Sequence, residues 1–218
     1  MKSIKYLLAV MVVVSSISFS KAQEQDISEV VELHITLRPP ISAQAKKARK
    51  LLYMQAGQVI CSGSFISPLG HILTAKHCVE EAEDITVVTS DDRYYSADII
   101  NKSDKADLAV IQIGRFNTPY LKLSTGTSQS QVITVIGSPL GLTRAKTIGT
   151  VAKILGDILI LDCTAVPGNS GGPVLNQRGE LVGVVSAMVM VFLGPAHLTV
   201  VESVDSIKFF FYKLSENR

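Results

Sequence analysis

Three short clusters contain residue types that could act together in nucleophilic chemistry. They are centred on His77, Asp107 and Ser170, in the segments T-A-K-H-C, K-A-D-L-A-V and P-G-N-S-G-G-P. A serine hydroxyl is a poor nucleophile at neutral pH and needs a base, and histidine suits that role because its pKa lies near neutrality. A carboxylate can then fix the imidazole tautomer and stabilise the imidazolium ion. The clusters predict Ser170 as a nucleophile, His77 as its general base and Asp107 as the acid that orients the base.

The glycines around Ser170 fit the same chemistry. Attack on a carbonyl group develops an oxyanion, which backbone N–H groups can stabilise. Gly168 before the serine, with Gly171 and Gly172 after it, lets the chain turn tightly enough to aim such groups. The chain order His, Asp, Ser is that of enzymes built from two β-barrels.

The elements that must position these clusters are predicted to be short strands. Apolar runs follow one another with Gly, Pro, Asp and Ser turns between them, which is typical of an all-β sandwich or barrel. No helical pattern of regular length alternates with the runs, so a βαβ fold is disfavoured. The runs are Leu51–Met54, Val59–Ile66, Ile72–Ala75, Ile85–Val88, Ala97–Ile100, Leu108–Ile113, Val132–Ile136, Ile148–Ile154, Ile158–Leu161, Val174–Leu175, Leu181–Ala187 and Leu198–Val201.

Three further segments have distinct patterns. Val31–Leu37 alternates apolar and polar residues, which predicts an exposed or edge strand, and Pro39-Pro40 ends it. Residues 116–131 are polar and rich in turn formers, and could connect two barrels. Residues 202–215 are predicted to form a helix because apolar residues recur at spacings of three and four, at Val204, Ile207, Phe211 and Leu214.

The first 22 residues have the pattern of an export signal. Lys2 and Lys5 precede the apolar stretch Tyr6–Val14, and Ser20-Lys21-Ala22 places small residues where a signal peptidase reads them. The stretch is too short to span a bilayer comfortably, so an uncleaved membrane anchor is the less favoured alternative. We therefore expect cleavage near Ala22, no stable membrane insertion afterwards, and a secreted or periplasmic protein.

Composition and charge exclude two classes of protein. Of the 218 residues, 47% are hydrophobic and only 18% are charged, which argues against intrinsic disorder. Loss of residues 1–22 would leave 18 basic against 19 acidic residues, a net charge near −1 that does not suit a nucleic-acid binder. The three cysteines of an exported chain predict one disulfide and one remaining thiol, and their count does not decide which two pair.

Five boxes of sequence, in order between Leu51 and Val201, resemble the trypsin-like serine peptidases. The Asn before Ser170 is similar to the bacterial Deg/HtrA branch, and Asp162 precedes the serine by eight residues, as an acid does in that branch. The boxes are G-S-F-I with G-H-I-L-T (63–74), T-A-K-H-C (74–78), D-L-A-V (107–110), V-I-G-S-P-L-G-L (135–142) and P-G-N-S-G-G-P (167–173).

The resemblance implies a fold and an activity. It implies two six-stranded antiparallel β-barrels, the first over about 46–115 and the second over about 132–201, joined by the linker 116–131 and followed by the C-terminal helix 202–215. Residues 23–45 would be an N-terminal arm or a propeptide. The implied activity is peptide-bond hydrolysis through an acyl-enzyme. Deg/HtrA members usually carry PDZ domains after this unit, and none is expected here because the chain ends in a single helix.

The resemblance also assigns site residues. The N–H groups of Gly168 and Ser170 would form the oxyanion hole. No acid stands at the base of the pocket for the residue before the cut, so we expect a small or apolar residue there and not Arg or Lys. His197 is expected at the surface or an edge. The pocket would be lined by Thr164, Ala165, Val166, Ser186, Ala187 and Met188.

The remaining implications concern the cysteines, activation and cofactors. Cys61 and Cys78 resemble the pair that forms a disulfide beside the active histidine, which would leave Cys163 as a buried small side chain. Asn169 replaces the acid that a newly freed N-terminus pairs with in trypsinogen, so no such switch is expected. No cofactor is implied, and no metal site, because the histidines lack ligand spacing with the cysteines or acids.

Two other functions are compatible with some of the same residues. The segment G-N-S-G-G also fits the nucleophile elbow of α/β-hydrolases. That fold needs an acid and then a histidine after the serine, and only Glu180 followed by His197 offers that order, with too little chain left for the sheet. The second alternative is a catalytically silent double-barrel module that binds peptides or partner proteins, left open by the poorly defined pocket segment 188–199. The partners expected of the enzyme are protein or peptide substrates, with the oligomeric state undecided.

Overall fold

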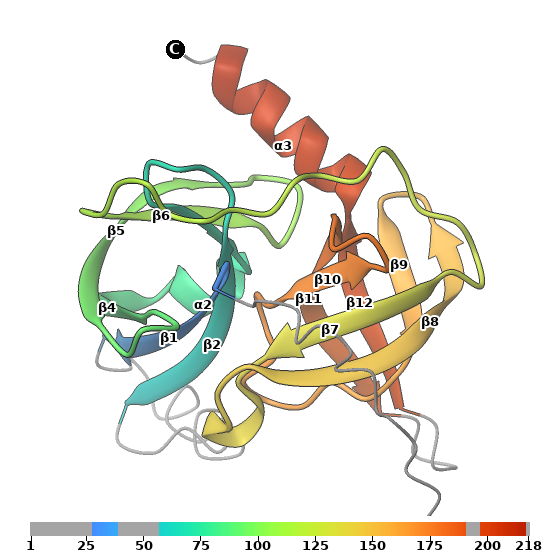
Figure 1. Ribbon diagram of the computed structural model, residues 1–218, viewed down its shortest axis with the longest axis horizontal. Helices are drawn as coiled ribbons and strands as arrows, with labels where there is room; N and C mark the ends of the chain where they lie inside the picture. Colours follow the sequence, from blue (N-terminus) through green and yellow to red (C-terminus); the bar gives the residue numbers. More distant parts are fainter. Residues whose placement is uncertain (1–27, 39–56, 191–196, 217–218) are drawn as a thin grey trace, which may run out of the picture.

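The computed structural model describes residues 28–38, 57–190 and 197–216, which form two closed antiparallel barrels of six strands each (Figure 1). The first barrel closes in the strand order β1-β2-β3-β6-β5-β4, and the second in the order β10-β11-β12-β9-β8-β7. A helix, α3, follows the last strand. The predicted fold, two six-stranded barrels and a C-terminal helix, is confirmed.

The first barrel and the short helix beside it come from the N-terminal half of the chain. Their bounds are β1 Val30–Leu37, β2 Gln58–Phe65, β3 His71–Thr74, α2 Lys76–Val79, β4 Ala82–Val88, β5 Tyr94–Lys102 and β6 Ala109–Ile113. The second barrel comprises β7 Val132–Gly137, the 3-10 turn η1 Pro139–Gly141, β8 Ala145–Leu155, β9 Ile158–Asp162, β10 Pro173–Asn176, β11 Leu181–Met190 and β12 His197–Ser203. Helix α3 is Val204–Glu216.

Strand β1 corrects two expectations drawn from the sequence. It pairs with β2 on one side and β4 on the other, so it is an interior strand of a closed barrel and not an exposed or edge strand. It also lies within the range 23–45 expected to be an arm or propeptide, so the first barrel begins at Val30. Leu33 and Ile35 fill the barrel core, and Glu32 on the other face is only 5% exposed. The expected export signal (1–22) and the apolar run at 51–54 lie outside the described residues.

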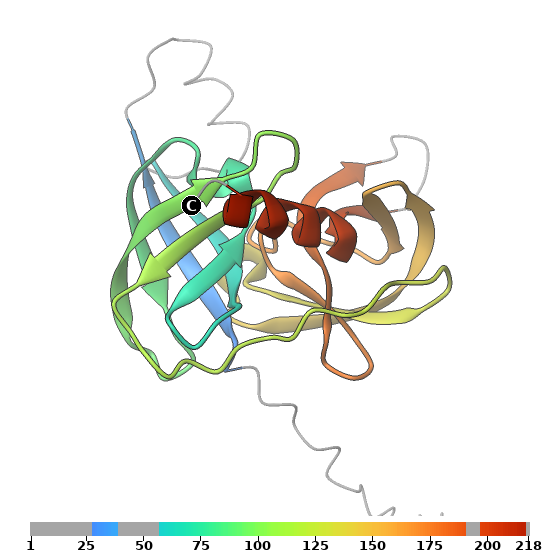
Figure 2. The same ribbon diagram turned by 90° about the horizontal axis from the view of Figure 1, so that it is seen from above.

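Helix α3 covers the junction between the two barrels, running from the end of β12 toward the first barrel (Figure 2). Its buried side chains Ile207 and Phe210 join an apolar cluster that contains Leu73 and Leu108 of the first barrel and Ile136 of the second. Each barrel interior forms a cluster of its own. Because burial of apolar surface drives packing, this third cluster fixes the barrels against each other. Neither described helix is long and apolar enough to cross a membrane.

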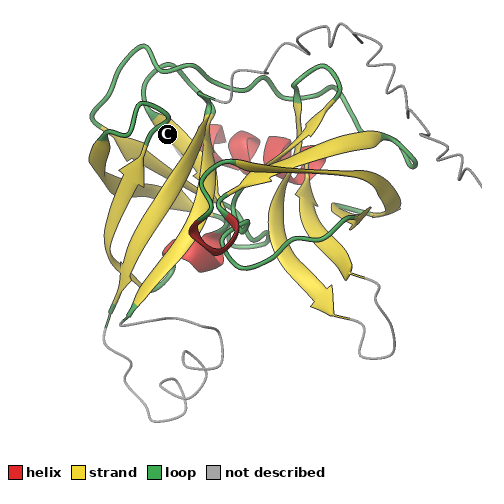
Figure 3. Ribbon diagram, turned by 60° about the horizontal axis from the view of Figure 1, so that its bottom comes forward, coloured by secondary structure: helices red, strands yellow, loops and turns green. Residues whose placement is uncertain are grey.

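The barrels lie side by side, and no described strand is shared between them (Figure 3). The segments that carry the chemically suited residues are connections and strand ends at the seam between the barrels. They are α2 after β3, the residues just before β6, the turn between β9 and β10, and a bulge in β11.

Candidate active site

His77 and Asp107 are joined directly by two hydrogen bonds. The backbone N–H of His77 donates to Asp107 Oδ1 over 2.9 Å, and His77 Nδ1 lies 2.7 Å from Asp107 Oδ2. The pairing of β3 with β6 explains this approach. Thr74, the last residue of β3, pairs with Ala109, the first residue of β6. His77 follows Thr74 closely in the chain and Asp107 closely precedes Ala109, so the two residues lie near each other. The imidazole is therefore held by its Nδ1 edge, which leaves Nε2 as the nitrogen able to accept a proton from another group.

A third hydrogen bond to Asp107 comes from the second barrel. Ser186 Oγ donates to Asp107 Oδ2 over 2.6 Å. The register of β11 against β12 shifts between Val185 and Ala187, so Ser186 is the extra residue of a β-bulge. Burial raises the pKa of Asp107, but the hydrogen bonds from His77 and Ser186 outweigh it and hold that pKa below its usual value. Asp107 is thus an ionised acceptor at neutral pH.

Ser170 lies beside the histidine but is not hydrogen-bonded to it. Its carbonyl oxygen accepts the N–H of Ser62 on β2 over 2.8 Å and lies 3.8 Å from Cys78 Sγ. The same sulfur is 3.8 Å from His77 Nε2. Within the described residues, no hydrogen bond uses Ser170 Oγ. The side chain is partly exposed, and catalytic hydrogen bonds of unliganded enzymes often shorten only when substrate binds.

The disulfide Cys61–Cys78 is present, as the resemblance implies. It links β2 to α2, and its Cys78 sulfur lies close to both His77 and Ser170. With a sequence separation of 17, such a crosslink stabilises a fold by about 3 kcal/mol in the chain-entropy account. Cys163 is a free, buried thiol in the core of the second barrel, and burial raises its pKa.

The turn that carries Ser170 is wedged between the two barrels. Gly168 has φ +103°, and a Cβ there would lie 2.1 Å from Ser138 O; Gly171 has φ +80°, and a Cβ would lie 2.2 Å from Thr74 Oγ1. The N–H groups of Asn169, Gly171 and Gly172 are bonded to carbonyls. In the described part of the chain, no acceptor takes the N–H of Gly168 or Ser170. These two donors are the expected oxyanion-hole pair, an assignment that stays a prediction.

Sequence reasoning missed the residues that hold this turn. Ser62 Oγ donates to Gly168 O over 2.7 Å and accepts the N–H of Ser138 over 2.9 Å. The N–H of Leu140, in η1, donates to Pro167 O over 2.9 Å. Thr74 Oγ1 donates to Ser62 O over 2.8 Å. The only local signal was a hydroxyl residue within each of two largely apolar runs, Ser62 in Val59–Ile66 and Thr74 in Ile72–Ala75.

The residues expected to line a substrate pocket are not all gathered in one place. Thr164 and Ala187 are exposed and Val166 is partly buried, whereas Ser186 is bonded to Asp107. Ala165 is 3% exposed and packs in the core of the second barrel. The side chains of Met188 and His197 lie outside what the structure describes. The pocket assignment therefore stays a prediction.

Replacing Gly168 by Ala is expected to disrupt the turn. The new Cβ would clash with the backbone carbonyl of Ser138, so the turn must move. The N–H groups of residues 168 and 170 would then no longer point in their present direction. Loss of oxyanion-hole donors costs about 10²- to 10³-fold in kcat, and we expect that loss for hydrolysis of a peptide substrate. Gly156→Ala is the matched control, because Gly156 also has a positive φ (+59°) but no atom within 4 Å of its Cβ position. Equal kcat in both variants would contradict the described turn.

Residues 61–184, which include His77, Asp107 and Ser170, match the family described as trypsin-like peptidase domain. The chain belongs to this family. A curated relative from Chlamydia pneumoniae, named probable periplasmic serine endoprotease DegP-like, is 37% identical over 141 residues, covering 59% of this chain and 28% of the relative. A relative of the same name from Pseudomonas savastanoi is 33% identical, covering 67% and 32%. This trypsin-like domain thus spans about a third or less of the curated relatives it matches.

Solved structures agree with the family assignment. A serine endoprotease from Yersinia pestis is 26% identical, with a TM-score of 0.69 over 86% of this chain and 62% of that one. The HtrA-type protease AlgW, solved with a tripeptide, has a TM-score of 0.71 over 88% of this chain and 62% of that one; at 23% identity the likeness concerns the fold alone. This trypsin-like domain has HtrA/DegP-like serine endoproteases as its homologues.

Proposed function

We propose that this trypsin-like domain is a serine endopeptidase in which Ser170, His77 and Asp107 act as the catalytic triad. The observation that carries the proposal is the set of hydrogen bonds to the partly buried Asp107, whose carboxylate accepts from His77 N, His77 Nδ1 and Ser186 Oγ. Such an acid fixes the imidazole so that Nε2 is free to accept a proton. Family membership and the endoprotease homologues add to it.

The geometry suggests how each group would act. His77 Nε2 would take the proton of Ser170 Oγ as that oxygen attacks the scissile carbonyl carbon. The developing oxyanion would accept the free N–H groups of Gly168 and Ser170. His77 would then give its proton to the leaving amine as the C–N bond breaks, leaving an acyl ester on Ser170. Water, deprotonated by His77, would hydrolyse that ester and restore the hydroxyl.

The proposed substrates are proteins or peptides with a small or apolar residue before the cut. Thr164, Val166 and Ala187, which we propose as part of the substrate pocket, carry no charge and are at least partly exposed. We place the enzyme outside the cytoplasm, as a secreted or periplasmic protein. The apolar stretch after Lys2 and Lys5, the disulfide Cys61–Cys78 and the periplasmic relatives support this location.

Labelling with a fluorophosphonate probe tests the proposal, because the probe reacts with activated serines. We expect one adduct on the folded protein, mapped by peptide mass spectrometry to Ser170. Labelling should disappear when the protein is unfolded first, since the reactivity depends on His77. An adduct on another serine, or none on folded protein with an intact disulfide, would reject the proposal.

A catalytically silent module that binds peptides is the second candidate. It is favoured by one observation: within the described residues, Ser170 Oγ and His77 are not hydrogen-bonded. In that case the folded protein would stay unlabelled but bind a library of peptides with small or apolar residues.

A further inference from the structure

Glu202 is a buried acid directly behind Asp107. It is the next-to-last residue of β12, where the strand meets α3, and it is 6% exposed. The residues on either side in the chain, Val201 and Ser203, are buried as well. Burial of a carboxylate is costly unless both of its oxygens find hydrogen-bond donors. Its position therefore calls for a specific explanation.

Both oxygens of Glu202 do have donors, and they come from different parts of the fold. The backbone N–H of Asp107, 95 positions earlier in the chain, donates to Oε1 over 3.0 Å. Ser206 Oγ, in the first turn of α3, donates to Oε2 over 2.9 Å. Hydrogen bonds to a carboxylate are shorter and stronger than neutral ones. Glu202 thus joins the main chain of Asp107 to the junction of β12 and α3.

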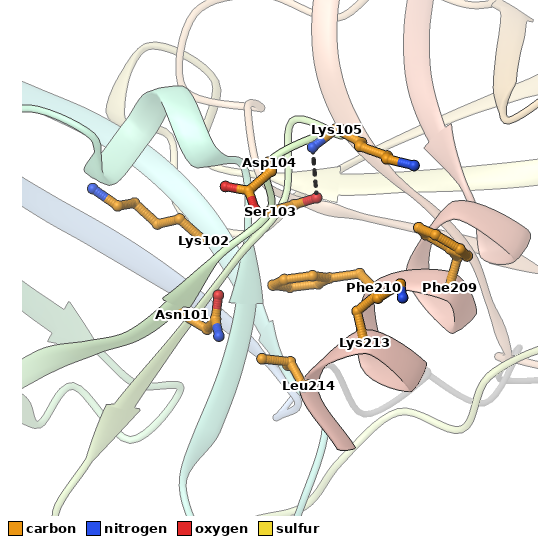
Figure 4. Close-up of a pocket in the computed structure, with 9 residues that line it drawn as sticks. All are labelled: Asn101, Lys102, Ser103, Asp104, Lys105, Phe209, Phe210, Lys213 and Leu214. Carbon is orange, nitrogen blue, oxygen red and sulfur yellow. Dashed lines mark hydrogen bonds between the residues drawn. The ribbon is translucent and has the colours of Figure 1, made fainter. Parts of the chain in front are cut away.

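The chain that leads to Asp107 runs from the end of β5 to the start of β6. Figure 4 shows residues 101–105 running past α3, with the N–H of Lys105 donating to Ser103 Oγ over 3.3 Å. A hollow of about 210 Å³ separates this segment from Phe209, Phe210 and other α3 side chains. Ser103 also accepts the N–H of Ala106 over 3.1 Å. Between the end of β5 and Asp107 the chain is therefore held by Ser103, whose own N–H donates to Leu108 O over 2.9 Å, by the packing of Ala106 against the apolar cluster at the barrel junction, and by Glu202.

We propose that Glu202 is a positioning residue for the catalytic acid. By holding the N–H of Asp107, it sets the main-chain direction from which the Asp107 carboxylate meets both His77 N and His77 Nδ1. The proposal rests on the triad assigned above, but its geometric part concerns the His77–Asp107 hydrogen bond alone. Glu202 touches no reacting atom and takes no part in proton transfer.

Two substitutions separate positioning from simple stability. In Glu202→Gln the amide oxygen can still accept the N–H of Asp107 while its NH₂ donates to Ser206 Oγ. Glu202→Met has a similar size but no acceptor. Misplacement of catalytic groups by an ångström costs up to about 100-fold, so for Glu202→Met we expect kcat to fall about 10- to 100-fold with KM nearly unchanged. Glu202→Gln should restore most of kcat.

The second readout is the proton NMR resonance of His77 Nδ1–H, which lies far downfield when a carboxylate accepts that proton. It should shift or broaden in folded Glu202→Met and stay in place in Glu202→Gln. Glu180→Met is the matched control, because Glu180 is also a hydrogen-bonded acid of the second barrel but contacts Asn176 and Arg178 at a surface turn. Its kcat and its His77 resonance should equal those of the wild type.

The outcomes decide between the two proposals. If the wild type cleaves peptides but Glu202→Met keeps its kcat and its resonance, the positioning role is wrong. If the wild type neither cleaves nor labels, the proposed function fails, while the resonance still tests whether Glu202 holds Asp107. Should Glu202→Met fail to fold, Glu202→Asp takes its place, because its shorter side chain withdraws the acceptor from Asp107 N. A wild-type kcat and resonance in that variant would overturn the role.

Discussion

Ser170→Ala is expected to lower kcat for peptide hydrolysis by about 10⁶-fold, the loss seen when a triad serine is removed. Without Oγ no acyl-enzyme can form, and only the free N–H groups of Gly168 and Ser170 remain to stabilise direct attack by water. The variant should fold as the wild type does. The contacts of this residue are made by its main chain, through the carbonyl oxygen that accepts the N–H of Ser62. Steady-state assays on a fluorogenic peptide, with thermal unfolding in parallel, measure both effects.

Ser96→Ala is the matched control for this change. Ser96 is exposed on β5, and its alanine variant should retain the wild-type kcat. Residual hydrolysis by Ser170→Ala at more than a few per cent of the wild-type rate would place the nucleophile elsewhere. Loss of thermal stability together with activity would instead show that Ser170 has a structural role.

Asp107→Asn is expected to lower kcat by about 10⁴-fold at neutral pH. The N–H of His77 requires an acceptor at Oδ1, so the amide oxygen of Asn would occupy that place and its NH₂ would face His77 Nδ1. The Asn NH₂ and a protonated His77 Nδ1 are both donors and cannot hydrogen-bond to each other, so the imidazole proton moves to Nε2. Nε2 can then no longer accept the proton of Ser170. Labelling of Ser170 by the fluorophosphonate probe should slow in parallel. The control is Asp98→Asn, an exposed position on β5.

The difference in stability between the wild type and Asp107→Asn should depend on pH in a defined direction. Because the pKa of Asp107 is held below its usual value, its ionised form favours the folded state. That contribution is complete above the unfolded pKa of about 4 and is lost as pH falls through the folded value. The excess unfolding free energy of the wild type over Asp107→Asn should therefore shrink as the pH falls from about 5 into stronger acid. An excess that grew over that range would contradict the described contacts.

Local motifs made much of this fold predictable. Each box that resembled the trypsin-like family lies within a few residues of a strand end, and the disulfide Cys61–Cys78 came with the same resemblance. Strand β1 was misread because alternation reveals only one apolar face. The other face, which carries Glu32, is also buried in the folded protein, and the local sequence pattern does not show this burial.

Contacts between distant segments could not be predicted. Ser186 was expected to line a substrate cleft, yet its hydroxyl bonds to Asp107, 79 positions away. That approach depends on a bulge in β11, which sequence spacing does not reveal. Glu202 was likewise read only as the start of a helix, because its contact with Asp107 exists only once the barrels are packed.

The two strand orders described above are the same order. If the strands of each barrel are numbered from one to six, both barrels close as 1-2-3-6-5-4. The chain is therefore an internal duplication in three dimensions. His77 follows the third strand of the first copy, and Ser170 follows the third strand of the second. The proposed base and nucleophile thus occupy corresponding connections of two facing repeats, so the proposed catalysis would need both repeats paired.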